Sequence, residues 1–311
     1  MKYRRLGSSG LEVSVVGLGC NNFGRRVDEQ GTRAVVEAAL DQGITLFDTA
    51  DMYGPRGLSE EYLGKALSGR RQDVLIATKF AGPMAEGTLH RGASRRYIME
   101  AAEASLRRLG TDFIDLYQIH FPDVQTPLGE TMRALDDLVR QGKVRYLGCS
   151  NFAGWQLVEA QWIAKTEHRE GFISAQNQYN LLDRRIEREL VPACRAHGVG
   201  VLPYFPLASG FLTGKYRRDQ QAPAGTRLAA AGPMADRLLT EANFAKLEAL
   251  GKFAAEREHS MLELAIGWLA SQPQVGSVIA GATSPGQVEQ NVRAGEWRLS
   301  EEELRQVDEL R

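Results

Sequence analysis

Residues 44–54 have the sequence ITLFDTADMYG, which has the form of a buried strand with polar groups at its carboxyl end. Three of its first four positions are apolar, Asp48 follows them, and a helical pattern begins near residue 59. Strands that are apolar on both faces and are each followed by a helix indicate a parallel sheet covered by helices. The stretch therefore predicts one strand-then-helix unit of an α/β protein.

The same alternation recurs along the chain. Short β-branched runs predict strands at residues 13–19, 44–50, 74–80, 113–120, 144–150, 172–179, 199–204 and 276–281. Helical patterns predict helices at residues 29–41, 59–68, 94–109, 127–141, 154–167, 184–197, 240–256 with 260–272, and 285–293. Eight such units close into a (β/α)8 TIM barrel of about 250 residues, so we expect residues 1–311 to form one barrel domain. The surplus length predicts long loops at the C-terminal face, at 81–93 and 208–236, and a terminal helix at 300–309.

A doubly wound nucleotide-binding sheet is the alternative architecture. Its fingerprint needs three glycines for a tight turn and for close approach to phosphates. The best candidate is Gly17-Leu18-Gly19-Cys20-Asn21-Asn22, which has Asn where the third glycine belongs and opens no helix. We therefore prefer the barrel.

Composition narrows the classes of function. The 311 residues carry 38 Lys plus Arg against 39 Asp plus Glu, a formal net charge of −1. This balance argues against a nucleic-acid binder, which has a basic excess. Cys20, Cys149 and Cys194 show no zinc spacing, so we expect no metal site and a cytoplasmic location. The apolar run 13–18 is too short for export or for membrane spanning, so we expect no membrane partner. The expected partner is a small-molecule carbonyl or alcohol, and the oligomeric state stays open.

Polar residues stand where three successive strands end. Asp48, Lys79 and His120 end the second, third and fourth strands, and each shares its strand face with mostly apolar residues. Catalytic groups of barrel enzymes lie at the carboxyl ends of the strands. If these faces line the barrel interior, the three side chains meet at its mouth, and Tyr53 follows Asp48 in the adjoining loop.

These four residues suit proton transfer to a carbonyl. A buried Lys79 must be paired or neutral, and Asp48 can keep it cationic. A neighbouring cation favours phenolate, so we expect the pKa of Tyr53 to fall below its reference of about 10. Such a phenol can act as a general acid, and His120 can hydrogen-bond the same substrate oxygen. A carbonyl is then being reduced, and a nicotinamide is the usual source of the hydride.

Several motifs resemble those of the aldo-keto reductases. They are FDTADMYG at 47–54, Ser59-Glu60 with LGKAL at 63–67, ATK at 77–79, SLRRLGTDFIDLYQIH at 105–120 and GKVRYLGCSNF at 142–152. The resemblance extends from about residue 3 to residue 309. It is closest to the bacterial branch that is also similar to potassium-channel β subunits, and it implies a reductase that transfers a hydride to an aldehyde or ketone.

The resemblance also implies residue roles. Tyr53 matches the proton donor, Lys79 and Asp48 match the pair that depresses its pKa, and His120 matches the residue that orients the carbonyl. Ser150, Asn151 and Gln176 match groups that hold the nicotinamide carboxamide. Tyr204 matches the aromatic residue that stacks on the nicotinamide ring. The resemblance implies a pyrophosphate belt that includes Leu207, Ser209, Gly210, Leu212 and Lys215, and an adenosine end formed by Gly281, Thr283, Gln287, Gln290 and Asn291. The remaining implied cofactor contacts are Cys20, Asn21, Phe205 and Pro206.

The adenosine end departs from many relatives. They carry Arg or Lys in this turn to grip a 2′-phosphate, whereas this chain has Gly281, Thr283 and Gln287. A bidentate cation is missing there. NADP(H) is favoured from the resemblance, and NAD(H) is possible.

Two further functions stay open. A Schiff-base aldolase would use Lys79 at its strand end, although such a lysine must be neutral and Asp48 opposes that. A cofactor-sensing or channel-type subunit would bind the nucleotide with negligible turnover. For a reductase, we expect a substrate mouth with some apolar character, formed by Asn21, Phe23, Met52, Phe80, Phe121 and Phe152.

Overall fold

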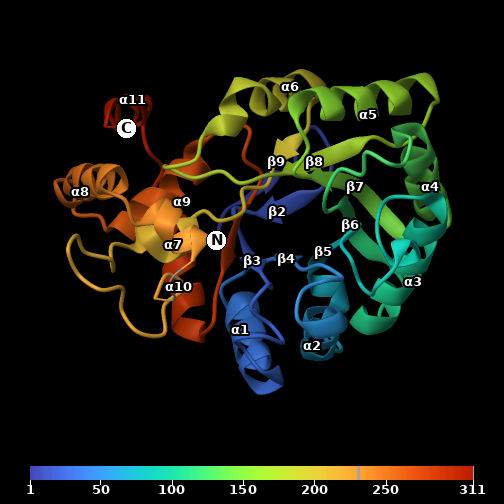
Figure 1. The fold of residues 1–311 in the computed structure, drawn as a ribbon, viewed down its shortest axis with the longest axis horizontal. Helices are drawn as coiled ribbons and strands as arrows, with labels where there is room; N and C mark the ends of the chain where they lie inside the picture. Colours follow the sequence, from blue (N-terminus) through green and yellow to red (C-terminus); the bar gives the residue numbers. More distant parts are fainter. Residues whose placement is uncertain (230–231, 311) are drawn as a thin grey trace.

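The barrel is formed by eight parallel strands in the described part of the chain. The computed structural model describes residues 1–229 and 232–310. The strands pair in the order β10-β3-β4-β5-β6-β7-β8-β9. Their bounds are β3 (Val16–Gly19), β4 (Leu46–Asp48), β5 (Leu75–Phe80), β6 (Ile114–Ile119), β7 (Val144–Ser150), β8 (Phe172–Gln176), β9 (Gly200–Val201) and β10 (Val278–Gly281). A parallel bridge from Val201 to Val275 joins β9 to the segment before β10, so the predicted (β/α)8 fold is confirmed (Figure 1).

Helices surround this sheet close to where the sequence predicts them. Their bounds are α1 (Glu29–Asp41), α2 (Leu58–Ala66), α3 (Arg95–Leu109), α4 (Leu128–Arg140), α5 (Gly154–Thr166), α6 (Leu190–His197), α8 (Glu241–Ala255), α9 (Met261–Ser271), α10 (Pro285–Ala294) and α11 (Glu301–Glu309). Two differ from expectation. The predicted helix 184–197 is a 3-10 turn (Arg185–Arg188) followed by α6. The predicted loop 208–236 contains a 3-10 segment (Ala208–Thr213) and overlaps α7 (Pro233–Leu238), while residues 230–231 lie outside the described residues.

An N-terminal hairpin closes the floor of the barrel. β1 (Tyr3–Arg5) pairs antiparallel with β2 (Glu12–Ser14), so the predicted strand 13–19 is in fact two strands. The hairpin turn packs tightly against the barrel, because a Cβ at Gly7 (φ 61°) would lie 2.3 Å from the Gly198 carbonyl oxygen. An apolar cluster fills the interior above this turn, made of Leu6, Val13, Leu46, Ala77, Leu116, Leu202 and Ile279.

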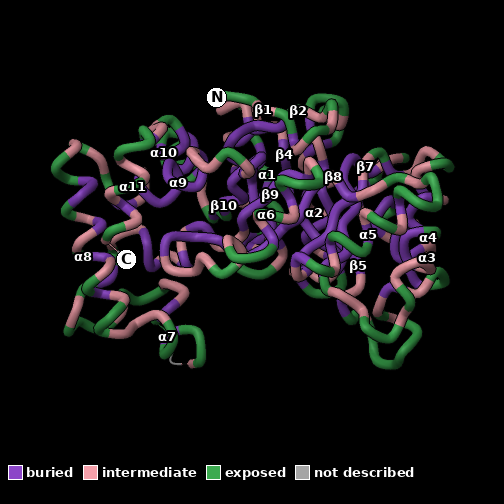
Figure 2. Tube along the Cα trace, turned by 90° about the horizontal axis from the view of Figure 1, so that it is seen from above, coloured by how far each residue is buried: buried purple, intermediate pink, exposed green. Residues whose placement is uncertain are grey.

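The two ends of the barrel therefore differ. Figure 2 shows the hairpin at one end of the buried interior and α7 at the opposite end. The apolar cluster excludes water from the hairpin end, which leaves the carboxyl ends of the strands as the open side. No helix within the described residues is both long and apolar enough to cross a membrane.

Candidate active site

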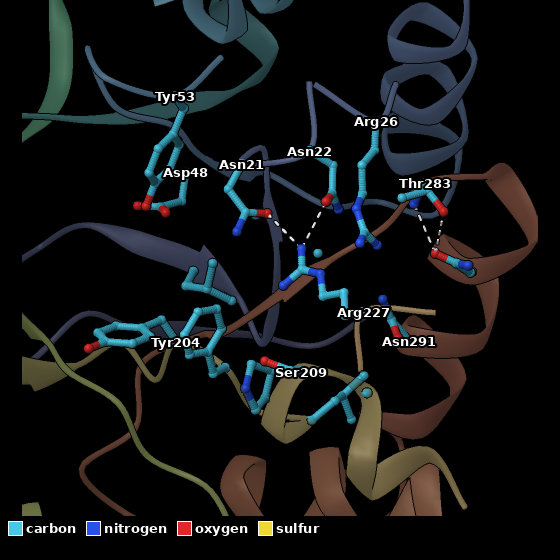
Figure 3. Close-up of a pocket in the computed structure, with 18 of the residues that line it drawn as sticks. Asn21, Asn22, Arg26, Asp48, Tyr53, Tyr204, Ser209, Arg227, Thr283 and Asn291 are labelled. Carbon is cyan, nitrogen blue, oxygen red and sulfur yellow. Dashed lines mark hydrogen bonds between the residues drawn. The ribbon is translucent and has the colours of Figure 1, made fainter. Parts of the chain in front are cut away.

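A cavity of about 860 Å³ opens at the carboxyl ends of the strands. Asp48 at the end of β4, Tyr53 in the following loop and His120 directly after β6 line its wall. Figure 3 shows Tyr53 and Asp48 at one end of the cavity, with Thr283 and Asn291 at the other. The structure thus brings three of the four expected catalytic residues to one wall.

The fourth residue, Lys79, lies directly behind this wall. Its side chain is completely buried, and its Nζ donates to Asp48 Oδ2 and to the Thr49 carbonyl oxygen, both at 2.7 Å. The same Nζ lies 3.4 Å from the Tyr53 hydroxyl oxygen and 4.8 Å from the Tyr53 ring centroid. An ammonium ion therefore faces the phenol, held there by a carboxylate and a carbonyl.

Burial changes the acidity of this group. Burial raises the pKa of Tyr53 above its ordinary value of 10.0, and the Lys79 charge only partly opposes it. The expectation of a lowered pKa is therefore wrong for this structure, because desolvation disfavours phenolate more strongly than Lys79 favours it. Burial lowers the pKa of Lys79, but attraction to Asp48 and Tyr53 outweighs burial and raises the net pKa, so Lys79 stays an ammonium ion.

His120 is a neutral imidazole beside the phenol. Burial, helped by the Lys79 charge, lowers its pKa to about 3. Its ring meets Tyr53 edge to face at 5.6 Å between centroids and stacks on Phe121 at 4.4 Å between centroids. A neutral His120 can donate one hydrogen bond to a substrate oxygen near Tyr53.

A second hydrogen-bond network links the Asp48 end of the cavity to β7, β8 and the segment after β9. Gln176 at the end of β8 donates from Nε2 to Asp48 Oδ1 at 2.7 Å, and its carbonyl oxygen accepts from Ser150 Oγ at 2.8 Å. Asn151 (φ 61°) donates to the His120 carbonyl oxygen and accepts from the Tyr204 hydroxyl at 2.7 Å. Ser150, Asn151, Gln176 and Tyr204 all line the cavity.

The expected pyrophosphate belt follows Tyr204. Phe205, Pro206, Leu207, Ser209, Gly210 and Lys215 line the cavity. Ser209 (φ 59°) and Gly210 (φ 91°) have left-handed backbones, which aim successive peptide groups in one direction as anion-binding turns do. Cys20 and Leu212, two expected contacts, do not line the cavity, because both side chains are completely buried in the core.

The expected adenosine end also lies along the cavity. Gly281, Thr283, Gln287, Gln290 and Asn291 line it. Gln287 Oε1 accepts from the Thr283 backbone N–H at 2.8 Å and lies 3.2 Å from Thr283 Oγ1, which fixes the turn between β10 and α10. This turn carries no cation of its own, as the sequence indicates.

Two arginines from elsewhere in the chain supply positive charge near this end. Arg227, on the segment after the belt, lies 2.8 Å from Asn22 Oδ1 and 3.4 Å from Asn21 Oδ1 (Figure 3). Arg26, after β3, also lines the cavity. Neither arginine was predicted from the sequence, because both lie in loops without a periodic pattern. The nearest sequence signal for Arg26 is the Asn21-Asn22 pair, which ends the imperfect match to the nucleotide-binding glycine motif at residues 17–22.

The expected substrate mouth is only partly formed. Asn21, Met52 and Phe121 line the cavity, whereas Phe23, Phe80 and Phe152 do not. Phe80 follows Lys79 on β5, so its side chain points to the opposite face, where it stacks on Tyr117 at 4.8 Å between centroids. Strand parity therefore excludes Phe80 from the mouth.

Comparison with known proteins identifies the family. The profile of the Aldo/keto reductase family matches residues 15–311. The chain belongs to this family. It is 37% identical over 303 residues to a probable voltage-gated potassium channel subunit beta of Arabidopsis thaliana, covering 94% of this chain and 91% of that one.

Two relatives in this family have reductase names. The L-glyceraldehyde 3-phosphate reductase of Escherichia coli K12 is 35% identical over 321 residues, covering 99% of this chain and 92% of the relative. The versiconal hemiacetal acetate reductase of Aspergillus parasiticus is 36% identical over 335 residues, covering 99% of this chain and 96% of the relative. Membership of the aldo/keto reductase family supports carbonyl reduction in general.

Proposed function

We propose that this chain is an NADP(H)-dependent reductase of aldehydes or ketones, with Tyr53 as the proton donor. The observation that carries the proposal is the contact between Tyr53 and Lys79. The phenol oxygen lies 3.4 Å from an ammonium ion that a buried carboxylate holds at 2.7 Å. This arrangement stands at the wall of a cavity large enough for a nucleotide and a small substrate.

The residues of the chain divide the work of proton transfer. A reduced nicotinamide, when bound, supplies the hydride. Tyr53 is a neutral phenol at neutral pH and gives its proton to the carbonyl oxygen, while Lys79 stabilises the charge that is left on the phenol. His120 donates a hydrogen bond that orients the carbonyl. In alcohol oxidation, Tyr53 takes the proton back.

The cavity lining fits an anionic cofactor. Three cations line it, Arg26, Lys215 and Arg227, and Asp48 is the one acidic residue among the described lining residues. Asp48 is already paired with Lys79, so no carboxylate of the lining opposes an anion. Ser150, Asn151, Gln176 and Tyr204 would hold the nicotinamide end. Arg26 and Arg227 would meet a 2′-phosphate, which favours NADP(H) over NAD(H).

The buried free thiols support a cytoplasmic location. Cys20, Cys149 and Cys194 are free and buried, which suits the reducing cytoplasm that we propose for this protein.

The two rival functions make different demands on the same residues. A Schiff-base aldolase needs a neutral Lys79, and the raised pKa of that group opposes it. A cofactor-sensing subunit needs only the cofactor contacts, and the beta-subunit name of one relative keeps this rival as a second candidate.

Absorbance of reduced nicotinamide separates these functions. NADPH and NADH are offered side by side with a panel of aldehydes, ketones and quinones. The proposal predicts consumption of NADPH with at least one carbonyl and slower consumption of NADH. Tight NADPH binding without turnover on the whole panel would favour the sensing subunit. Borohydride trapping of substrate on Lys79 would favour the aldolase.

A further inference from the structure

Gln118 lies beneath the catalytic group without reaching the cavity. Strand register places Lys79, Gln118, Gly148 and Ser174 side by side across β5, β6, β7 and β8. The Gln118 side chain is completely buried. Two residues earlier on the same face, Leu116 belongs to the apolar cluster that fills the barrel floor. Gln118 therefore stands at the boundary between the apolar floor and the polar site.

The amide of Gln118 contacts the carboxylate that holds Lys79. Its Nε2 donates to Asp48 Oδ1 at 3.3 Å. The same oxygen accepts from Gln176 Nε2 at 2.7 Å, while Lys79 uses the other oxygen. Two amide donors on one oxygen and one ammonium on the other fix the plane of the carboxylate.

The neighbouring strand leaves room for this reach. A Cβ at Gly148 would lie 3.1 Å from Gln118 Cγ and 2.4 Å from Ser174 Oγ. Any larger residue at position 148 would push the Gln118 side chain from its path to Asp48.

Packing alone does not account for a glutamine at this position. Gln118 Oε1 is buried and has no hydrogen-bond partner among the described residues. An unpaired buried oxygen destabilises a fold, and an apolar side chain of similar shape would avoid it. Among the described residues, the bond to Asp48 is the one hydrogen bond that this side chain makes.

We propose that Gln118 is a positioning residue for the proton transfer, which holds the Asp48 carboxylate against Lys79 and keeps the ammonium ion facing Tyr53. This inference rests on the proposed reductase function. Gln176 lines the cavity and would also contact the cofactor, whereas Gln118 does not line it. The bond from Gln118 to Asp48 is therefore independent of what the cavity holds.

The charge of Asp48 determines the direction of the effect. Asp48 acts to raise the pKa of Tyr53, and an amide donor on its oxygen offsets part of that charge. Without the donor, Tyr53 holds its proton more tightly. Both the acid limb of alcohol oxidation and the alkaline limb of carbonyl reduction then move to higher pH.

The test compares Gln118→Met with Ser174→Ala. Methionine keeps the shape of Gln118 and removes the donor. Ser174 is in the same layer, is equally buried, and its Oγ has no hydrogen-bond partner among the described residues, so it is the matched control. For Gln118→Met we expect the limb of alcohol oxidation to move up by about 0.5 pH unit or more, and turnover to fall roughly threefold to tenfold. The KM for NADP and the thermal unfolding midpoint should be retained.

The control variant separates a positioning role of Gln118 from a packing effect, and the wild type tests the reductase function itself. Ser174→Ala should keep the wild-type pH profile. An active Gln118→Met enzyme with an unmoved profile overturns the positioning role, and so does an equal shift in both variants, since that would show a packing effect. A loss of unfolding midpoint without a change of profile would show a structural role only and also overturns it. Absence of turnover in the wild type would instead overturn the proposed reductase function.

Discussion

Lys79 has no access to water, so its charge depends on three oxygen neighbours. Asp48, Thr49 and Tyr53 supply these oxygens, and Asp48 is the one that carries a formal charge. Two buried ions lose their hydration, and their mutual attraction offsets this only while both are present. The Asp48–Lys79 pair therefore contributes to function by placing an ammonium ion at Tyr53, and loss of either ion leaves the other buried without a counter-ion.

Asp48→Asn should strongly destabilise the fold, because it leaves the Lys79 ammonium ion buried without its counter-ion. We expect the free energy of unfolding to fall by about 3–5 kcal/mol, measured by urea denaturation. The double variant Asp48→Asn/Lys79→Met is the control, and it should recover much of the loss. A single variant as stable as the wild type would show that Lys79 is not held as a cation.

Asp51 lies close to Asp48 in the chain, and its replacement is expected to stabilise the fold where replacement of Asp48 destabilises it. Its carboxylate is 1% exposed and neither oxygen has a hydrogen-bond partner among the described residues. Burial, followed by repulsion from Glu60, raises its pKa from 3.8 to about 8. The folded state then holds a proton that the unfolded state has released, so this stability is present below pH 3.8 and is lost as the pH rises toward 8.

Asp51→Asn should therefore stabilise the protein at pH 8, by more than about 1 kcal/mol, and less so at pH 5. Thermal or urea unfolding at the two pH values measures this difference. Equal effects at both pH values would mean that Asp51 is not protonated in the folded state.

At the scale of the elements, α2 approaches the end of α3 closely at a glycine. A Cβ at Gly64 on α2 would lie 2.4 Å from the carbonyl oxygen of Leu109, the last residue of α3. Backbone cannot yield to this contact without moving the helix. Gly251 on α8 has nothing within 4 Å of the same position.

This pair of glycines separates close packing from helix propensity. Gly64→Ala should destabilise the fold by about 1–3 kcal/mol through overpacking. Gly251→Ala should stabilise it by about 0.5–1 kcal/mol, since alanine is the better helix former. Chemical unfolding measures both variants. A stabilising Gly64→Ala would show that α2 does not approach the end of α3 this closely.

The elements also show what the sequence can predict. The barrel follows from strand-then-helix alternation, because parallel strands must be buried on both faces and therefore have a strong apolar pattern. Strand parity predicted that Asp48, Lys79 and His120 meet, and the structure places them together. Strand β1 of the N-terminal hairpin and helix α7 were missed, since a three-residue strand and a six-residue helix leave too short a pattern.

Long-range effects limited the prediction of the site. The pKa of Tyr53 has the opposite direction from expectation, because the degree of burial is set by loops that the sequence does not place. Arg227 contacts Asn22, which is 205 residues away in the chain, and no local sequence pattern predicts such a contact. Local geometry was thus predictable, and the electrostatics of the assembled cavity were not.

For the whole molecule, the main feature is that the two ends of the cavity differ in charge. The catalytic end holds a neutral His120 and the closed Asp48–Lys79 pair, while Arg26 and Arg227 lie toward the Thr283 end. An elongated nucleotide whose phosphates lie away from its nicotinamide would bind in one direction only in such a field.

Arg227→Ala should weaken NADPH binding about tenfold or more and change NADH binding by less than about twofold, because only NADPH carries the 2′-phosphate. Cofactor fluorescence measures both dissociation constants. Arg218→Ala is the control on the same segment, since Arg218 pairs with Glu241 and Glu248 and does not line the cavity. An equal loss for both nucleotides would place Arg227 elsewhere along the cofactor.

The most direct measurement on the central claim is turnover of Tyr53→Phe at saturating NADPH, with the dissociation constant of NADPH measured beside it. Phenylalanine keeps the ring and removes the hydroxyl group that carries the acidic proton. We predict a loss of about 10²-fold or more in kcat with NADPH affinity unchanged within about twofold. Near-normal turnover in this variant would contradict the account, because the proton would then come from another group.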